Sequence, residues 1–276
     1  MRRRSALAGS ALAVVALSGC AVERPSTNGG SVTSGVSPAV SSREPLAGDA
    51  ATWSLAPEEL LDPKTTFLVV EVTRLGCASG ITGTVLDPQI HYDETQVLLR
   101  TDVEKIGPGA HECQGNDAVP VEIHLDQPLG FRELLDAECL QGEAVGTAAC
   151  TEAVRWAPPA GLTRHDGVPD WQPPPVYSYV VQSSCGEQAF IGEYAVRVEQ
   201  GAVASVDPLR RGFDETGVDS VPSLTAMLDL ARQAEREGAA EVWVDQDGVP
   251  RWFDLDLRLD SIDDENCFLI THYEEH

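Results

Sequence analysis

The stretch His272-Tyr273-Glu274-Glu275-His276 carries the residue types of a metal site. Its order matches H-x-x-E-H, a pattern found in zinc-dependent proteases. That chemistry needs a helix to bring both histidines to one face, whereas "CFLITHY" just before it predicts a strand. On a strand, His272, Glu274 and His276 share a face and could hold a metal ion only adventitiously. We therefore expect a solvated strand end and no resident metal.

Two acidic stretches contain the ligand types that calcium prefers. "DQDG" at residues 245–248 is similar to the beginning of a calcium loop, but Val-Pro-Arg-Trp follows instead of the alternating ligands and distant glutamate that such a loop requires. We expect a hairpin turn there. The stretch "DSIDDEN" is expected to be a solvated loop, with weak calcium binding left open; its acidic residues are Asp260, Asp263, Asp264 and Glu265.

Motifs for nucleophilic or nucleotide chemistry are missing from the sequence. It contains no G-x-S-x-G, no G-x-G-x-x-G and no P-loop. Cys185 in "SSCG" is expected to be in a disulfide, which makes it a poor nucleophile. The other histidines are scattered along the chain, at His91, His111, His124 and His165. We therefore expect a protein that is not an enzyme and that needs no cofactor.

One cysteine is distinguished by what precedes it. Residues 2–4 are all arginine, and residues 7–17 form a short run of alanine, leucine, valine and small residues. This is the order of a signal peptide, and the run is too short for a transmembrane helix. It ends in Leu17-Ser18-Gly19-Cys20, which resembles the bacterial lipobox, whose cysteine receives a diacylglycerol and becomes the N-terminus after cleavage. We predict that Cys20 anchors the chain to the cell membrane on its extracytoplasmic side, because two acyl chains hold a protein stably.

Charge and cysteine count narrow the class of protein further. The chain has 19 basic and 44 acidic residues and a formal net charge of −25, which repels nucleic acid and anionic headgroups. Nucleic-acid binding is therefore excluded. Six cysteines remain besides Cys20, and outside the cytoplasm an even number predicts disulfides. They are Cys77, Cys113, Cys139, Cys150, Cys185 and Cys267, and none forms a Cys-x-x-Cys motif.

Apolar periodicity divides the first part of the mature chain into three segments. Residues 20–60 begin at the lipidated cysteine and are rich in Ser, Gly, Pro and Thr, which predicts a disordered tether; about 30 such residues span roughly 30 Å. Residues 64–150 contain the strand patterns "TTFLVVEVTRLGC", "TQVLLRTDV" and "VPVEIHL", which predict a small all-β sandwich. Residues 151–175, with "WAPPAG" and "WQPPP", predict a proline-rich linker that spaces two domains.

Residues 176–276 have the clearest pattern. A strand and a hairpin that turns at Gln200-Gly201 precede a helix, which should begin after the N-cap Ser223 and stop at Gly238. Its apolar stripe consists of Leu224, Met227, Leu228, Ala231 and Ala234. A second hairpin follows, "EVWVDQDGVPRWFDLDLRLD", alternating as far as Leu259, and "CFLITHY" is the last strand. The order β-β-β-α-β-β-β predicts an α+β domain, with one antiparallel sheet and the helix across its apolar face. The whole chain is thus expected to be β-rich with two domains.

Several of these segments together resemble a bacterial family. They are the Tyr-x-Tyr strand, the "VRVEQGAV" hairpin, the join "PSLTAMLDLARQAEREGAAEVWV" and the hairpin "DQDGVPRWFDLDL". The family is the domain of unknown function 6174, common in lipoproteins of high-GC Gram-positive bacteria, and the resemblance covers about residues 176–275. It implies a location and a fold and supplies no catalytic residues. Family members often carry closely spaced cysteines after the first strand; here Cys185 is alone, which makes Cys267 its expected partner.

The division into domains also pairs Cys185 with Cys267 and leaves three possible pairings among the other four cysteines. Of these we favour Cys77–Cys113 with Cys139–Cys150, and we expect all three bonds to be structural. The sequence as a whole predicts a lipid-anchored envelope protein that binds a protein, a wall component or a small ligand without catalysis. The alternatives are an inhibitor or scaffold that docks onto another exported protein, and an enzyme whose site is not recognisable.

Overall fold

The fold is taken from a computed structural model that describes residues 48–186, 190–210, 219–260 and 264–276. Cys20, the predicted signal peptide and most of the predicted tether lie outside these residues, as does Asp263. Residues 45–276 cluster as one compact unit. Within the described residues, no helix has the length and apolar character needed to cross a bilayer.

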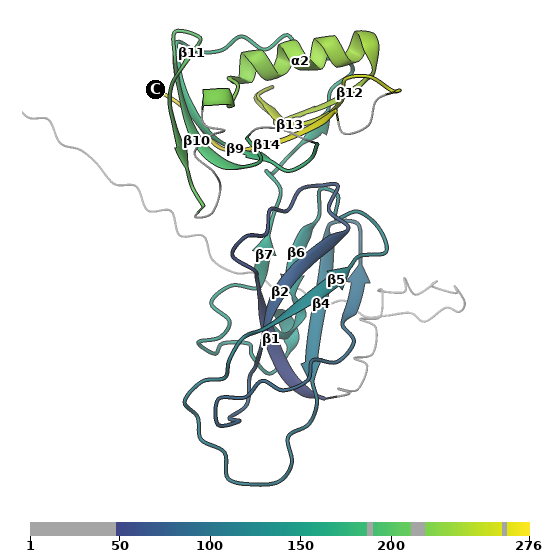
Figure 1. The fold of residues 1–276 in the computed structure, drawn as a ribbon, viewed down its shortest axis with the longest axis vertical. Helices are drawn as coiled ribbons and strands as arrows, with labels where there is room; N and C mark the ends of the chain where they lie inside the picture. The colour runs from purple at the N-terminus through teal and green to yellow at the C-terminus, as the bar shows by residue number, and fades with distance from the viewer. Residues whose placement is uncertain (1–47, 187–189, 211–218, 261–263) are drawn as a thin grey trace, which may run out of the picture. The chain divides into compact units, whose positions relative to one another are not determined.

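The N-terminal half of the described chain forms a mixed seven-stranded sheet with the order β5-β2-β1-β4-β6-β7, and β3 pairs with β4 (Figure 1). All its pairs are antiparallel except β4 with β6. Its buried side chains, among them Trp53, Val70 and Leu99, pack into one apolar cluster. The predicted all-β character is confirmed. The strands expected to form a sandwich instead follow one hydrogen-bonded path, because β1 pairs with both β2 and β4. The elements are β1 (Asp49–Leu55), β2 (Phe67–Arg74), β3 (Gln89–Tyr92), β4 (Gln96–Val103), β5 (Val119–His124), β6 (Glu133–Asp136), α1 (Ala137–Gln141) and β7 (Val154–Trp156).

Two predicted boundaries differ from the structure. β1 lies inside residues 20–60, the predicted tether, with Ala51 and Trp53 buried. Its sequence "DAATWSL" is mostly small residues, so it lacks the strong alternation that marks a strand. The predicted linker 151–175 also contributes β7 to the first sheet and β8 (Thr163–Arg164) to the second. Both are short edge strands, the position at which neighbouring prolines are tolerated.

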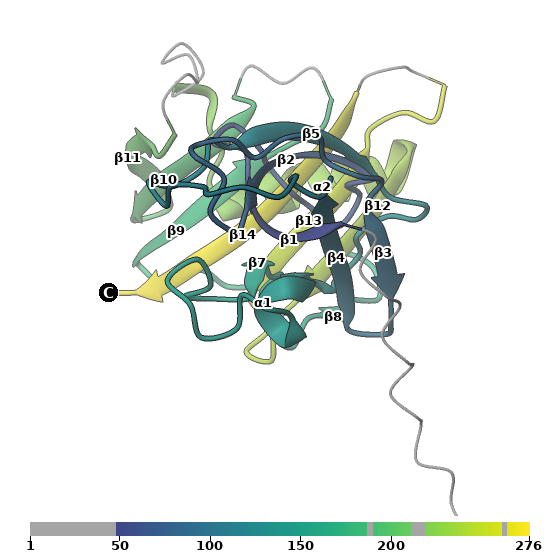
Figure 2. The ribbon, with the colours of Figure 1, turned by 90° about the horizontal axis from the view of Figure 1, so that it is seen from below.

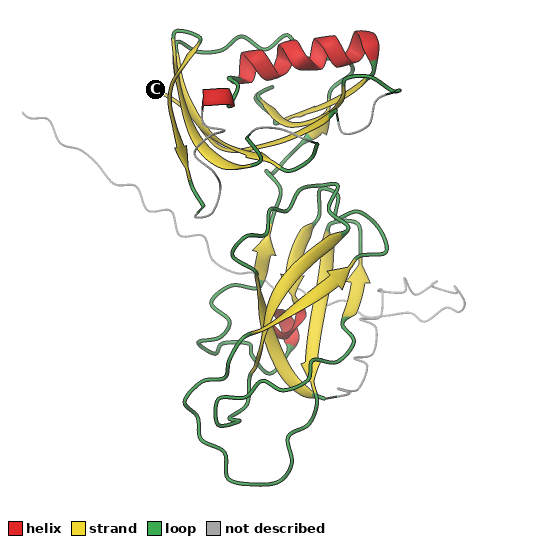
Figure 3. Ribbon diagram, viewed as in Figure 1, coloured by secondary structure: helices red, strands yellow, loops and turns green. Residues whose placement is uncertain are grey.

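The C-terminal half forms an antiparallel seven-stranded sheet with the order β11-β10-β9-β14-β13-β12-β8. The labels β11 to β12 follow one another across it in Figure 2, and in Figure 3 α2 lies across one of its faces. The predicted β-β-β-α-β-β-β order and the helix on the sheet are confirmed, with β8 as an added edge. The elements are β9 (Val176–Ser183), β10 (Gly192–Glu199), β11 (Ala202–Pro208), α2 (Leu224–Glu237), β12 (Ala239–Val244), β13 (Pro250–Asp256) and β14 (Glu265–Glu275).

Local signals explain where α2 begins and ends. The Ser223 hydroxyl accepts a hydrogen bond from the Ala226 amide at 3.3 Å, and so caps the first turn. The predicted stripe is buried against the sheet, where it meets side chains such as Phe253. Gly238 ends the helix, and a Cβ there would lie 2.0 Å from the Asp256 carbonyl oxygen. β13 ends at that same residue, so the predicted alternation does not continue to Leu259, which is 72% exposed.

Both apolar and polar contacts join the two sheets. Trp252 and Leu269 lie on the face of the second sheet opposite α2 and form a cluster with Phe131 and Trp156 of the N-terminal half. The Gln182 amide donates to the Leu61 carbonyl oxygen at 2.8 Å in a buried hydrogen bond. These contacts keep part of that sheet face from solvent and leave another part open.

Three disulfides join the pairs favoured from the sequence: Cys77–Cys113, Cys139–Cys150 and Cys185–Cys267. The last connects the residues beyond β9 to β14, its neighbour in the sheet. Disulfides are typical of oxidising compartments, which supports an extracytoplasmic location.

A candidate binding trough on the C-terminal sheet

The open part of the second sheet forms a shallow trough of about 390 Å³ over β9, β10, β11 and β14. Its position follows from strand alternation, because Tyr177, Tyr179 and Val181 point toward α2 and the residues between them point the other way. The trough is therefore lined mainly by the polar side of each strand. Its polar side chains are Ser178, Arg197, Ser205, Asp207, His272 and Glu274.

A β-bulge in β14 shapes the trough. Thr271 pairs with Val180 and Glu274 with Ser178, so two residues of β14 stand opposite the single residue between them on β9. His272 takes the left-handed conformation, with φ of 47°, which is uncommon for a residue with a side chain. The bulge brings the His272 ring to the trough, where an unbroken alternation would not place it. Strained backbone of this kind is most often retained where it serves a site.

Tyr273, the other bulged residue, turns toward the apolar side of the sheet. Its ring packs beside Tyr177, and the Arg251 guanidinium lies 5.1 Å from the ring centroid. Burial, and then the nearby Glu275 carboxylate, raise the pKa of Tyr273 well above its ordinary value. Tyr273 therefore stays a neutral hydrogen-bond donor, and its ring packs the bulge against the apolar side of the sheet.

The carboxylates of the trough are the groups most open to a ligand. Arg197 pairs with Glu199 at 2.9 Å, beside the trough. Asp207 and Glu274 are exposed, and neither forms an ion pair within the described part of the chain. The trough thus offers two free acceptor carboxylates and two hydroxyls, with the single arginine partly neutralised by its own pair. Such a surface suits ligands with ammonium, guanidinium or other donor groups.

A serine and a histidine also meet at the edge of this surface. The Ser178 hydroxyl oxygen lies 2.8 Å from Nε2 of His276; Ser178 is on β9, and His276 directly follows the adjacent strand β14. An activated serine needs a base that is oriented by a third group. In the chain as far as it is described, Nδ1 of His276 has no hydrogen-bond partner. The described residues therefore supply a serine and a base but no third group that orients the base.

The other candidate residues have structural surroundings. Among the described residues no group of three His, Cys, Asp or Glu side chains is placed to hold a metal ion, although Glu274 and His276 both lie near Ser178. Asp245 accepts hydrogen bonds from the Asp247 and Val249 amides at 3.0 Å each, so "DQDG" forms the predicted hairpin turn. In the acidic loop, Asp264 lies 3.5 Å from Arg258.

Sequence reasoning missed Ser178, Arg197, Ser205 and Asp207. Ser178, Arg197 and Ser205 lie on predicted strands, and Asp207 directly follows one. Alternation marks the first three as outward-facing but gives no reason to group the four. The grouping depends on the pairing of β9 with β14, which brings Ser178 beside Glu274. No family model, curated protein or solved structure matches the chain, so the resemblance to the domain of unknown function 6174 family stays a prediction.

Proposed function

We propose that this protein is a lipid-anchored, extracytoplasmic binding module whose trough recognises a cationic segment of another envelope component. The observation that carries the proposal is the pair of unpaired carboxylates, Asp207 and Glu274, in a trough that the bulge at His272 shapes. The membrane enters through the predicted diacylglycerol on Cys20. The residues that precede Cys20 and the three disulfides support this compartment.

The charge of the chain fits a cationic partner. A formal net charge of −25 creates a negative potential that draws positively charged partners and raises their association rate. An exposed ion pair contributes only about 0–1 kcal/mol, so each carboxylate of the trough adds a modest amount. Specificity then has to come from the Ser178 hydroxyl and from the shape of the bulge. Binding should accordingly weaken at high ionic strength.

Site-specific photo-crosslinking in intact cells tests this proposal. A photoreactive amino acid replaces Ser205 in the trough, and in a control protein it replaces Arg232 on the exposed side of α2. We expect a discrete adduct from position 205 and none from position 232. The yield of this adduct should fall when Asp207→Asn is combined with Glu274→Gln.

A charge-matched control distinguishes the effect of the trough carboxylates from the effect of the chain's net charge. Glu94→Gln combined with Asp247→Asn removes the same charge from exposed residues that do not line the trough. The adduct should persist in this variant. Loss of the adduct in both double variants, or equal adducts from positions 205 and 232, would contradict recognition by the trough.

The second candidate function is hydrolysis, because the Ser178 hydroxyl contacts the His276 ring. A fluorophosphonate probe tests it directly, because it reacts with activated serines. We expect no labelling of the folded protein. Labelling that is lost in Ser178→Ala would establish a reactive serine and overturn the proposal of a binding module without catalysis.

A further inference from the structure

The C-terminal sheet has two edges that differ in length. β8 closes one of them with only two residues, Thr163 and Arg164. β11 forms the other edge, beside β10 in Figure 2; six of its seven residues are exposed, and Asp207 is the only charged one. Folded proteins usually keep an edge strand short or charged, because its outer backbone groups can pair with another chain. The long edge at β11 is therefore a place where a partner strand can add.

The backbone of β11 directs hydrogen-bonding groups away from the sheet. The Leu209 amide donates to the Glu193 carbonyl oxygen of β10 at 2.9 Å. Because backbone groups alternate in direction along a strand, those of Asp207 also point to β10, and the N–H and C=O of Val206 point outward. Pro208 holds the next outward position and offers only its carbonyl oxygen, since its nitrogen carries no hydrogen. Within the described residues β11 pairs with β10 alone, so an added strand can bond to all three groups.

Asp207 selects the side chain that an added strand should carry. Its own backbone groups face β10, so the residue opposite it on an added antiparallel strand forms a non-hydrogen-bonded pair, in which the Cα atoms are about 4.5 Å apart and the side chains are closest. Asp207 lines the trough, so that side chain would face the trough as well. A lysine or arginine there can pair with the Asp207 carboxylate, and Glu274 adds to the negative potential of the trough.

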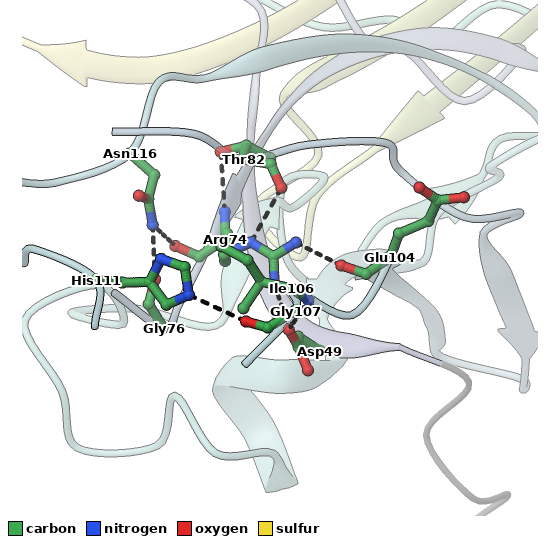
Figure 4. A network of polar contacts seen from close by, with 9 residues as sticks. All are labelled: Asp49, Arg74, Gly76, Thr82, Glu104, Ile106, Gly107, His111 and Asn116. Carbon is green, nitrogen blue, oxygen red and sulfur yellow. Dashed lines mark hydrogen bonds and ion pairs between the residues drawn. The ribbon is translucent and has the colours of Figure 1, made fainter. Parts of the chain in front are cut away.

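Asp207 differs in this respect from a carboxylate that the fold itself uses. Asp49 pairs with the guanidinium of Arg74, which is only 5% exposed, and accepts from the Ile106 amide at 3.1 Å (Figure 4). That guanidinium also donates to the Thr82 carbonyl oxygen at 3.0 Å. The network therefore joins parts of the fold to one another. In the part of the chain that the structure describes, the Asp207 carboxylate has no such partner, which leaves it for a ligand.

We propose that an extended cationic segment of the partner adds to β11 as an antiparallel strand. A basic residue lies opposite Asp207, and an apolar residue lies opposite Val206, whose side chain packs toward the core beneath α2. This inference rests on the recognition by the trough proposed above and specifies the conformation in which the partner binds. A second copy of the chain fits this edge less well, because two chains of formal net charge −25 repel each other.

Backbone N-methylation of a synthetic peptide tests strand addition. The probe is the rhodamine-labelled peptide "TKVKVKT", whose binding to the mature chain carrying Cys20→Ser is followed by fluorescence anisotropy. In the proposed register the valine N–H groups point to β11 and the lysine N–H groups point away. Methylating both valine nitrogens should weaken binding by at least about tenfold, because two backbone hydrogen bonds are lost. The matched control, with methyl groups on two lysine nitrogens, should bind within about threefold of the parent peptide.

Variants of the protein distinguish strand addition from recognition by charge alone. Asp207→Asn combined with Glu274→Gln should weaken the binding of the parent peptide by about threefold to tenfold, and the control pair Glu94→Gln with Asp247→Asn by less than about twofold. Equal affinity of the two methylated peptides, or a larger loss from methylated lysines, would overturn strand addition. If the trough variant still weakened binding in that case, recognition by the trough would stand.

Two further outcomes would also overturn the inference. One is no detectable binding of the parent peptide, in which case the crosslinking experiment above still tests the trough separately. The other is a dimer of the protein that the peptide dissociates, measured by sedimentation equilibrium, because a second copy would then be the occupant of β11. We expect a monomer that binds the peptide.

Discussion

Replacing Cys185 and Cys267 together by alanine should destabilise the fold more than removing either of the other disulfides. In the chain-entropy account, a disulfide stabilises by restricting the unfolded chain, and its contribution grows with the logarithm of the closed loop. The sequence separations are 82 residues for Cys185–Cys267, 36 for Cys77–Cys113 and 11 for Cys139–Cys150. The three bonds therefore differ enough to be ranked.

The expected losses follow from these separations. The entropy expression gives about 4.5 kcal/mol for the longest loop, about 3.8 kcal/mol for the intermediate one and about 2.8 kcal/mol for the shortest. Cys267 is also fully buried beside Trp252 and Leu269, so truncation there adds on the order of 1 kcal/mol of lost packing. Because domains are usually stable by only about 5–15 kcal/mol, the Cys185/Cys267 variant should be only marginally folded.

Guanidinium unfolding followed by tryptophan fluorescence measures this ranking. Each pair is replaced by alanines in turn, and the free energies of unfolding are compared with the parent protein. We expect the order Cys185/Cys267, then Cys77/Cys113, then Cys139/Cys150. A Cys139/Cys150 variant that loses as much stability as the Cys185/Cys267 variant would refute the loop-entropy reasoning for this fold.

Three further predictions concern single residues. Burial raises the pKa of Asp136 despite hydrogen bonds from Arg155 and the Trp53 amide, so the folded state keeps this proton to higher pH than the unfolded chain. Stability should therefore fall as pH rises from about 4 through the raised value, and Asp136→Asn should flatten that part of a urea-unfolding pH series; an unchanged slope would contradict the assignment. Ser223→Ala should cost about 1 kcal/mol in thermal unfolding, whereas Ser223→Asp keeps the cap. Gly238→Ala should cost about 1–3 kcal/mol because its Cβ meets a backbone oxygen, and Gly76→Ala, which meets nothing, should be neutral by comparison.

The C-terminal fold could be predicted because its signals are local. Alternation marks the strands, Ser223 marks the start of α2, and Gly238 marks its end. β1 was not predicted, because two of its buried residues are alanines, which differ little in hydrophobicity from their neighbours. β8 is two residues long and exists only because it pairs with β12.

The trough could be predicted only in part, for a physical reason. "HYEEH" drew attention to His272 and Glu274, both of which line it. Their partners come from strands joined by the long-range pairing of β9 with β14, and the bulge at His272 breaks the alternation on which the sequence argument depends. Neither the pairing nor the bulge has a local signature.

Mass spectrometry of the protein from its own membranes, alkylated without prior reduction, tests the lipid anchor and the disulfides together. We predict an N-terminal peptide that begins at Cys20 and carries a diacylglycerol, with the other six cysteines protected as three disulfides. A Cys20 that is alkylated as a free thiol, or a mature N-terminus elsewhere, would contradict it.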